Sequence, residues 1–270
     1  MAKPTRPAAH AAARWRDQAW RGLALLAICT AALQLYFVAR IALMTSVNPK
    51  STSFQRSEIR RLMVDKRPLA WAQEWASDAL IADNLKRAVI ASEDAGFVDH
   101  NGVEWDALEQ AWDKNQRASV QAAKKNAALE KTQAKAQAGV KHKATVEPKV
   151  VGGSTITQQL AKNLFLSGER TAARKAQEFV ITLTLEALLS KRRILEIYLN
   201  HVEWGEGLFG AQAASHHYFK ADAARLAAPQ AARLAVMLPA PKRFEKSPGS
   251  AFVSGRAATI MARMPAAELP

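Results

Sequence analysis

An uninterrupted apolar stretch near the N-terminus constrains this chain more than any other feature. Gly22 to Ala39 contains no charged side chain, and apolar residues resume after Arg40 and continue to Met44. As a helix, these residues would span roughly 34 Å, which is enough to cross the hydrocarbon core of a bilayer. Arg40 stands near one end, where a long basic side chain can reach the interface. We therefore expect one membrane-spanning helix over residues 22–44.

Basic residues before this stretch predict its orientation. Residues 1–21 carry five Lys or Arg and one acid, and Trp15 and Trp20 stand where interfacial aromatic residues are expected. The positive-inside rule then places residues 1–21 in the cytoplasm and residues 45–270 outside. The alternative is a cleaved signal peptide, whose apolar region is typically about 7–15 residues long and ends in small residues. Arg40 and Ile41 interrupt such a site, which favours the anchor.

The positive charge of the chain is concentrated in two segments. The formal net charge is +14, of which residues 1–21 contribute +4 and residues 114–149 contribute +7. A basic composition alone suggests nucleic acid, but the second segment is expected outside the cytoplasm. This distribution suits anionic lipid or an anionic substrate. The single cysteine, Cys29, lies inside the apolar run, so no disulfide or zinc cluster can form within the chain.

The part after the anchor is predicted to be mainly α, because no segment shows sustained period-two alternation. Trp71 and Trp75, four residues apart, are interpreted as core residues on one helix, and Trp105 to Trp112 also shows a helical pattern. Further helices are expected over residues 154–166, 171–189, 191–199, 208–218 and 229–238. The last ends at Pro239 and Pro241, which cannot continue a helix.

Residues 114–149 differ in composition from the rest and are interpreted as an insertion. They include nine Ala, eight Lys and only four large aliphatic residues. Ala and Lys favour helix, but without an apolar stripe the segment cannot bury a face. We expect a solvated helix, a loop, or both. Gly139 and Pro148 predict that any helix ends before Gly152.

Three polar clusters combine side chains that can carry chemistry. They are Glu93-Asp94 with Phe97, His100 and Gly102; the run from Gly152 to Asn163; and Arg174-Lys175 with Glu178. Each has a structural alternative. Adjacent acids are usually solvated, hydroxyl residues can simply cap a helix, and an Arg–Glu pair four residues apart can be a surface pair worth about 0.3–0.5 kcal/mol.

The histidines also have structural alternatives. His100 can be a hydrogen-bonded structural histidine instead of a general base. His216 and His217 suggest a metal site, but adjacent helical side chains point apart, which argues against it.

The three clusters together match the needs of glycosyl transfer. That chemistry needs a carboxylate that moves a proton to or from a sugar hydroxyl, as Glu93 could. A pyrophosphate leaving group also needs cations to hold the charge that develops on its oxygens. Lys162, Arg174 and Lys175 could supply them, together with N–H groups at the helix start after Gly153.

In their order and content, these motifs resemble the monofunctional biosynthetic peptidoglycan transglycosylases, which share their glycosyltransferase domain with class A penicillin-binding proteins. The resemblance covers about residues 80–250. Its five motifs are EDAGFVDHNG at 93–102, GGSTITQQLAKN at 152–163, RKAQE at 174–178 continuing through KRRILEIYLN at 191–200, WGEGLFGAQAASHHYF at 204–219, and LAVMLPAPKRF at 234–244.

The resemblance implies an all-α, lysozyme-like domain in the periplasm, anchored to the inner membrane by a single pass. It implies polymerisation of lipid II into β-1,4-linked glycan with inversion and release of undecaprenyl pyrophosphate. Glu93 corresponds to the catalytic base and Glu178 to a second essential carboxylate. Mg²⁺ or Mn²⁺ near Glu178 is an expected cofactor. Expected partners are lipid II, the growing glycan chain and the inner membrane, with cell-division or elongation proteins as further candidates and no nucleic acid.

The resemblance also implies a set of substrate-binding residues. Lys162, Arg174 and Lys175 correspond to residues that bind the pyrophosphate or the adjacent sugar. The other implied residues are Asp94, Phe97, His100, Gly153, Ser154, Thr155, Thr157, Gln158, Gln159, Asn163, Glu186 and Asn200.

Two features depart from the family pattern. Glu104 stands where the family commonly has Asp, so the acid has a longer reach. The segment 114–149 is longer than the usual connection between the first two motifs, and we expect its lysines to lie against anionic lipid and improve substrate capture.

Three other functions remain as alternatives. A lytic enzyme of the same fold would also use one glutamate, but such enzymes commonly follow it with Ser, whereas Asp94 follows Glu93. A membrane-tethered component without activity would not need the acids and cations. A bifunctional synthase is not expected, because the chain has no Ser-x-x-Lys and few residues follow Phe244.

Overall fold

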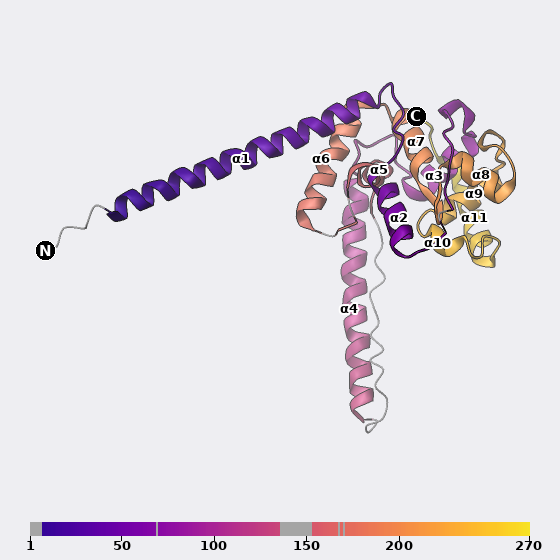
Figure 1. Ribbon diagram of the computed structural model, residues 1–270. Coiled ribbons are helices and arrows are strands. Elements are labelled where there is room, and N and C mark those ends of the chain that lie inside the picture. Colours follow the sequence, from indigo (N-terminus) through magenta and orange to yellow (C-terminus); the bar gives the residue numbers. More distant parts are fainter. Residues whose placement is uncertain (1–6, 69, 136–152, 167, 170) are drawn as a thin grey trace. The chain divides into compact units, whose positions relative to one another are not determined.

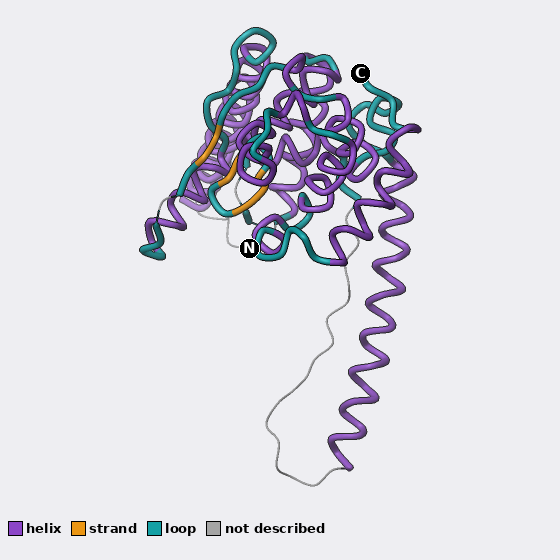
Figure 2. The backbone as a smooth tube through the Cα atoms, turned by 90° about the vertical axis from the view of Figure 1, so that its right-hand side faces the viewer, coloured by secondary structure: helices purple, strands orange, loops and turns teal. Residues whose placement is uncertain are grey.

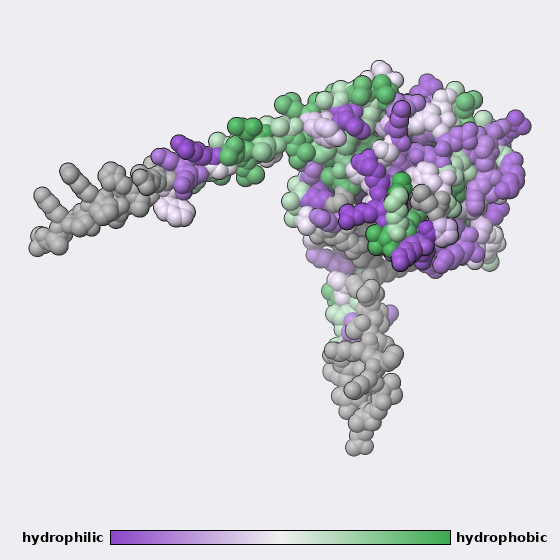
Figure 3. Space-filling model, in the orientation of Figure 1, coloured by the Kyte–Doolittle hydropathy of each residue, from purple (hydrophilic) through white to green (hydrophobic). Residues whose placement is uncertain are grey.

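The computed structural model describes residues 7–68, 70–135, 153–166, 168–169 and 171–270, which fall into two units, Met1–Asn48 and Pro49–Pro270. The first unit contains α1, Pro7–Leu43. Within the described residues, its Asp17–Leu43 stretch is the one helix long and apolar enough to cross a membrane. Leu25, Leu26 and Leu35 are each more than 60% exposed, and Figure 3 shows the hydrophobic surface of this helix. The helix expected over residues 22–44 is present and ends one residue earlier than expected, at Leu43, but it begins well before residue 22, and its crossing of a membrane stays a prediction.

The second unit is mainly helical, as predicted (Figures 1 and 2). Its helices are α2 Ser53–Val64, α3 Asp83–Glu93, α4 Trp105–Lys135, α5 Ile156–Phe165, α6 Ala172–Leu188, α7 Lys191–His201, α8 Ala211–Phe219, α9 Ala228–Met237, α10 Pro241–Phe244 and α11 Ala251–Arg263. Three short strands, β1 Ala72–Gln73, β2 Glu203–Gly205 and β3 Leu208–Phe209, form a sheet in the order β1-β3-β2.

Several of these helices are capped at their N-terminus by a side-chain hydroxyl. The side chains of Thr52 and Thr155 each accept a hydrogen bond from the N–H three residues on, and the side-chain oxygens of Gln55 and Gln158 accept one from the backbone N–H of the cap residue. These two capping boxes satisfy N–H groups that a helix start leaves free. Thr171 caps α6 in a similar way. The predicted starts near residues 154 and 171 are confirmed, and α5, α6, α7 and α9 lie close to their expected ranges.

The core is built around α3 and α5. α3 packs against α9 and α11, where small buried residues such as Ala88, Ala231 and Ala235 allow close approach. α5 packs against α2, α6 and α7. Trp204 and Tyr198 are among the largest fully buried side chains, and burial of each large apolar side chain contributes about 1.5–3 kcal/mol. This packing brings the end of α3 beside the start of α5.

The prediction that Trp71 and Trp75 share a helix is wrong. β1 lies between them and pairs in parallel with β3, with Ala72 opposite Leu208, and the Trp71 ring packs on Phe209 with 4.6 Å between centroids. The helix expected to begin at residue 208 begins instead at Ala211, as α8, because Leu208 and Phe209 form β3 in this sheet. The two strands are far apart in sequence, so local periodicity does not show their pairing.

The predicted helix after Trp105 is confirmed and is longer than expected. α4 runs for 31 residues and includes the first part of the insertion, up to Lys135. Trp105, Trp112 and Val120 are exposed along it, as expected of a solvated helix. The rest of the insertion, with Gly139 and Pro148, lies outside the described residues.

A buried charged cluster connects α2 to the C-terminal part of the second unit. Lys242 contacts the carboxylate of Glu58, and its Nζ lies 3.4 Å from Oε1 of Glu203. Arg61 bonds to Glu58 at 3.0 Å and to Glu206 at 2.7 Å. Burial raises the pKa of Glu203 to about 7, with Lys242 acting in the opposite direction.

Glu203→Gln should stabilise the protein increasingly as the pH rises. Because the carboxyl pKa is raised, the folded state binds the proton more tightly than the unfolded chain does. The stability that this proton contributes is lost as the pH rises from about 4.5, the ordinary pKa, to about 7. Glutamine does not ionise, so its advantage in melting temperature should grow from about pH 5 to about pH 8. Thermal unfolding across this range tests it. A Glu203→Gln advantage independent of pH would contradict the assignment.

Candidate active site

A pocket of about 470 Å³ lies between α2, α5 and α6. α5 and the residue before its cap contribute Ser154, Gln158, Gln159, Lys162 and Asn163. α6 contributes Arg174, Lys175 and Glu178. The fold therefore brings the predicted second and third clusters together, because α5 and α6 pack against each other.

Glu178 holds two of the three cations in this pocket. Its side chain is only 4% exposed. Arg174 Nη1 donates to it at 2.9 Å, and Lys175 Nζ contacts its other oxygen. The surface-pair alternative for Arg174 and Glu178 is therefore wrong. The carboxylate is the shared counter-charge that orients both basic side chains.

Two donors in the pocket have no partner. Nε of Arg174 is buried without a hydrogen bond. Among the described residues, Nζ of Lys162 makes neither a hydrogen bond nor an ion pair. Desolvation lowers the pKa of Lys162, and the charge of Glu178 opposes this shift while Arg174 and Lys175 add to it. An ammonium with no partner among the described residues, beside a buried and unsatisfied guanidinium N–H, is a site that favours an anion.

Glu93 stands beside this pocket, at the C-terminal end of α3. Gln159, which lines the pocket, donates from Nε2 to Glu93 Oε2 at 3.0 Å. The hydroxyl of buried Tyr198 donates to Gln159 Oε1 at 2.9 Å and so fixes the orientation of this amide. Burial raises the pKa of Glu93, and the hydrogen bonds from Gln159 and Ser92 oppose the shift. A carboxylate with a raised pKa that is held in place by hydrogen bonds is suited to proton transfer.

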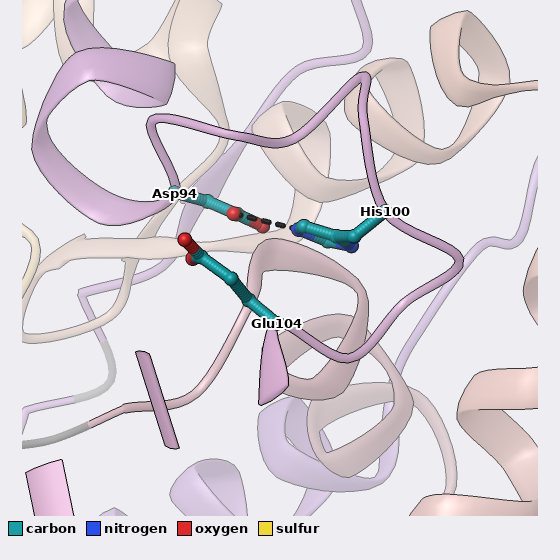
Figure 4. A group of neighbouring side chains, drawn as sticks. All are labelled: Asp94, His100 and Glu104. Carbon is teal, nitrogen blue, oxygen red and sulfur yellow. Dashed lines mark hydrogen bonds and ion pairs between the residues drawn. The ribbon is translucent and has the colours of Figure 1, made fainter. Parts of the chain in front are cut away.

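Asp94 and His100 form a positioning network next to Glu93 (Figure 4). The N–H of Gly102 donates to His100 Nδ1 at 3.0 Å, so the proton of the ring is on Nε2, which donates to Asp94 at 2.8 Å. The other oxygen of Asp94 accepts the N–H of Ile156, the first residue of α5, at 2.9 Å. Asp94 thus ties the first motif to the start of α5, and His100 is hydrogen-bonded as its structural alternative requires, while its substrate-binding role stays a prediction.

Gly102 is required by this arrangement. Its φ is +83°, and an added Cβ would lie 2.7 Å from a Thr182 methyl carbon. Its carbonyl accepts the hydroxyl of Thr155, the cap of α5, at 2.6 Å. The first motif is therefore held against α5 and α6 through backbone that only glycine can provide.

The carboxylates do not fit a protein-bound divalent cation at Glu178, because Arg174 and Lys175 already occupy its two oxygens. Asp94, His100 and Glu104 place one ligand atom each within 4.8 Å of one another. However, the protonated Nε2 of His100 faces Asp94 and cannot bind a metal in this state. The Glu178 carboxylate therefore serves as a counter-charge for cations.

Several other predicted residues do not line the pocket but make contacts in the elements around it. Thr157 donates to Glu186 at 2.5 Å, and Lys191 reaches the same Glu186 oxygen at 2.9 Å while lying 4.6 Å from the Phe97 ring centroid. Asn200 bonds to both backbone groups of Ala76. Thr155, Thr157, Phe97 and Asn200 are buried and do not line the pocket in this structure, so their substrate-binding roles stay predictions. Gly153 lies half-buried immediately before Ser154.

His216 and His217 do not form a metal site. His216 Nε2 lies 3.0 Å from Asp222, and Nδ1 on the opposite side of the ring lies 3.6 Å from Glu74. The two carboxylates therefore face different nitrogens and cannot share one ion with this ring.

Sequence reasoning missed three contributors to the site. Tyr198 and Lys191 lie within the KRRILEIYLN motif but were not singled out, because an apolar helical pattern does not show which side chains contact Gln159 and Glu186. The wall formed by α2 was also missed. Its start carries the pattern Thr52-x-x-Gln55, which is a capping-box signal.

Asp94→Asn should destabilise the protein and disorganise the site. An amide has one acceptor oxygen, whereas Asp94 accepts from both Ile156 and His100. Loss of a buried charge-assisted hydrogen bond costs about 1.5–3 kcal/mol. We expect a lower melting temperature and weaker amide-exchange protection at the start of α5. Asp222→Asn, at an exposed pair, is the control, and equal melting temperatures for Asp94→Asn and wild type would contradict this role.

The fold and site define a helical domain, with an apolar N-terminal helix in the same chain, that places a carboxylate with a raised pKa beside a cationic pocket. A model of the family described as transglycosylase matches residues 63–124 and 131–265. The chain belongs to this family.

Named relatives extend the match. The chain is 49% identical over 247 residues to the biosynthetic peptidoglycan transglycosylase of Paraburkholderia phytofirmans, covering 92% of this chain and 91% of that protein. It is 48% identical to the protein of the same name from Paraburkholderia xenovorans over the same shares. The protein of that name from Herminiimonas arsenicoxydans is 49% identical over 88% of this chain and 91% of its own length.

Proposed function

We propose that this chain is a peptidoglycan glycosyltransferase that polymerises lipid II into β-1,4-linked glycan with inversion, releasing undecaprenyl pyrophosphate. The observation that carries the proposal is the pair of cationic groups in the pocket that Gln159 joins to Glu93: Arg174 Nε, buried without a hydrogen bond, and Lys162 Nζ, which has no partner among the described residues. An acid alone would suit many reactions. An acid beside an anion site suits transfer from a phosphate-linked sugar.

Glu93 acts as the general base in this proposal. Its carboxylate takes the proton from the 4-hydroxyl of the acceptor sugar as that oxygen forms a bond to the anomeric carbon of the donor. The bond from the anomeric carbon to the pyrophosphate oxygen breaks, and its electron pair leaves with the pyrophosphate. Attack from the face opposite the leaving group inverts the anomeric configuration. Gln159 and Tyr198 hold Glu93 in place for this step.

The cationic pocket stabilises the leaving group. Lys162 supplies a point charge, and the free Nε–H of Arg174 supplies a directional donor. Glu178 keeps Arg174 and Lys175 oriented before the substrate arrives, so little reorganisation is needed as charge develops on the pyrophosphate. The expected Mg²⁺ or Mn²⁺ remains a proposal and would enter with the pyrophosphate.

A membrane-bound substrate suits the surfaces of both units. The apolar Asp17–Leu43 stretch supports a single pass through the inner membrane, with residues 1–21 cytoplasmic and the second unit periplasmic. α6 exposes Phe179, Val180 and Leu183. These residues support contact of the second unit with the lipid surface on which lipid II is presented.

The lytic alternative would use Glu93 as an acid and has no use for the unsatisfied cations. A tethered component without activity would use neither. The test is incubation of the detergent-purified full chain with labelled lipid II, followed by lysozyme digestion. The proposal expects a lysozyme-sensitive polymer and one undecaprenyl pyrophosphate for each linkage. Release of fragments from isolated cell wall, without polymer, would instead establish the lytic function.

The basic insertion is proposed to hold the enzyme against anionic lipid. Deletion of residues 116–147 should weaken binding to anionic liposomes and slow polymerisation on them, because each Lys or Arg near such a surface contributes about 1 kcal/mol. Liposome sedimentation and polymerisation rates measure both effects. Unchanged binding and an unchanged rate would refute this role.

A further inference from the structure

The third wall of the pocket comes from α2, which precedes the segment matched by the family model. Phe54, Ser57 and Glu58 line the same pocket as Lys162 and Arg174, and the family match begins at residue 63. α2 packs on α5, so the wall is an integral part of the second unit. None of the five motifs assigns a role to these residues.

Glu58 has an unusual environment for a residue in an anion-binding pocket. Its side chain is 11% exposed. One oxygen, Oε2, accepts from Arg61 Nε at 3.0 Å and contacts Lys242 Nζ. The other oxygen, Oε1, has no hydrogen bond among the described residues. The two cations therefore fix the carboxylate through one oxygen, while the other oxygen remains available as an acceptor for a ligand.

Because Glu58 is a carboxylate, it can bind only certain groups of a ligand. A phosphate oxygen would be repelled by the carboxylate and attracted to Lys162 and Arg174. The groups that a carboxylate binds well are hydroxyl and amide N–H donors. A sugar next to a pyrophosphate offers both, as hydroxyls and acetamido N–H groups. α2 and α6 both pack on α5, so one pocket presents cations from α5 and α6 and an acceptor from α2.

We propose that Glu58 is a sugar-recognition residue, whose Oε1 accepts a hydrogen bond from a hydroxyl or acetamido N–H of the saccharide attached to the donor pyrophosphate. Arg61 and Lys242 are positioning residues that hold this carboxylate. The inference rests on the proposed function and adds a specificity element to it. Without Glu58, the pocket should still bind the pyrophosphate but lose its preference for ligands that carry the sugar.

The test compares two ligands that differ in the sugar. The full chain in detergent is titrated with lipid II and with undecaprenyl pyrophosphate, for wild type and for Glu58→Ala. We expect Glu58→Ala to weaken lipid II binding about tenfold, the usual effect of losing a hydrogen bond to a charged group, and to leave undecaprenyl pyrophosphate binding unchanged. In polymerisation, KM for lipid II should rise more than kcat falls.

Two further variants separate recognition from structure. Glu58→Gln keeps the shape and one acceptor oxygen but loses the charge, so its affinity for lipid II should lie between those of wild type and Glu58→Ala. Glu196→Gln is the matched control. Its carboxylate is similarly covered, with a side-chain exposure of 13%, and pairs with Arg193 at 2.7 Å, but it does not line the pocket. It should bind both ligands as wild type does.

Glu58→Ala is expected to fold, because its cations keep other partners. Lys242 retains Glu203, and Arg61 retains Glu206. Circular dichroism and thermal unfolding check this, and Glu58→Gln serves if the alanine variant unfolds.

The outcomes distinguish the inference from the proposed function. A wild type that makes no polymer refutes the proposed function. A wild type that polymerises, with Glu58→Ala binding lipid II equally well, refutes the inference alone. Equal losses for lipid II and undecaprenyl pyrophosphate would also overturn it, because they would show that Glu58 only shapes the pyrophosphate site.

Discussion

Glu93→Gln should abolish polymerisation, with kcat lowered about 10³-fold. Glutamine is almost isosteric with glutamate and can keep a hydrogen bond to Gln159, which holds this side chain at 3.0 Å. The amide cannot accept a proton from the acceptor hydroxyl. The loss should therefore appear in kcat, whereas the affinity for lipid II changes little. Single-turnover assays with saturating lipid II measure it directly.

The same variant should be more stable than wild type at neutral pH. Burial raises the pKa of Glu93, so the folded state binds the proton more tightly than the unfolded chain. This stability is present at acid pH and is lost as the pH rises through the raised pKa. A higher melting temperature together with lost activity would show that the charge is kept for function. Near-normal kcat in a folded Glu93→Gln would contradict its role as base.

Lys162→Met should lower kcat/KM about 10²-fold, as expected when a preorganised group that stabilises developing charge is removed. Lys162 is the cation of the pocket that has no partner among the described residues, and methionine keeps its apolar length. Affinity for undecaprenyl pyrophosphate should fall about tenfold, because a hydrogen bond between charged groups is lost. Isothermal titration and initial rates measure the two effects.

The control for this variant is Lys246→Met, at an exposed lysine outside the pocket. It should leave both values unchanged. Lys162→Met should also raise the melting temperature, because desolvation lowers the pKa of Lys162 and the folded state thus disfavours its charge. Unchanged binding of undecaprenyl pyrophosphate would show that Lys162 does not contact the pyrophosphate.

Local signals in the sequence were sufficient to predict much of the fold. The apolar run of α1 and the helices α5, α6 and α9 were predicted because their caps, apolar stripes and prolines act within one or two turns. The short sheet was not predicted. Ala72 and Leu208 pair across more than a hundred residues, and the strands are too short to show alternation.

The candidate site was predicted as separate clusters, and only the structure shows how they meet. The bond between Gln159 and Glu93 joins residues 66 positions apart. The sequence alone could not distinguish a structural His100 from a catalytic one, because its role depends on which groups face its two nitrogens. Glu58 carried no signal at all, since its importance depends on Lys242, 184 positions away.

The most direct test of the account is the pH dependence of the single-turnover rate on lipid II, for wild type and Gln159→Ala. A general base works when deprotonated, so the wild-type rate should rise with pH through a pKa above the usual range for glutamate. Gln159→Ala removes a hydrogen bond that lowers this pKa, so the rise should move to higher pH. A rate that falls as the pH rises through the same range would show Glu93 acting as an acid and would contradict the account.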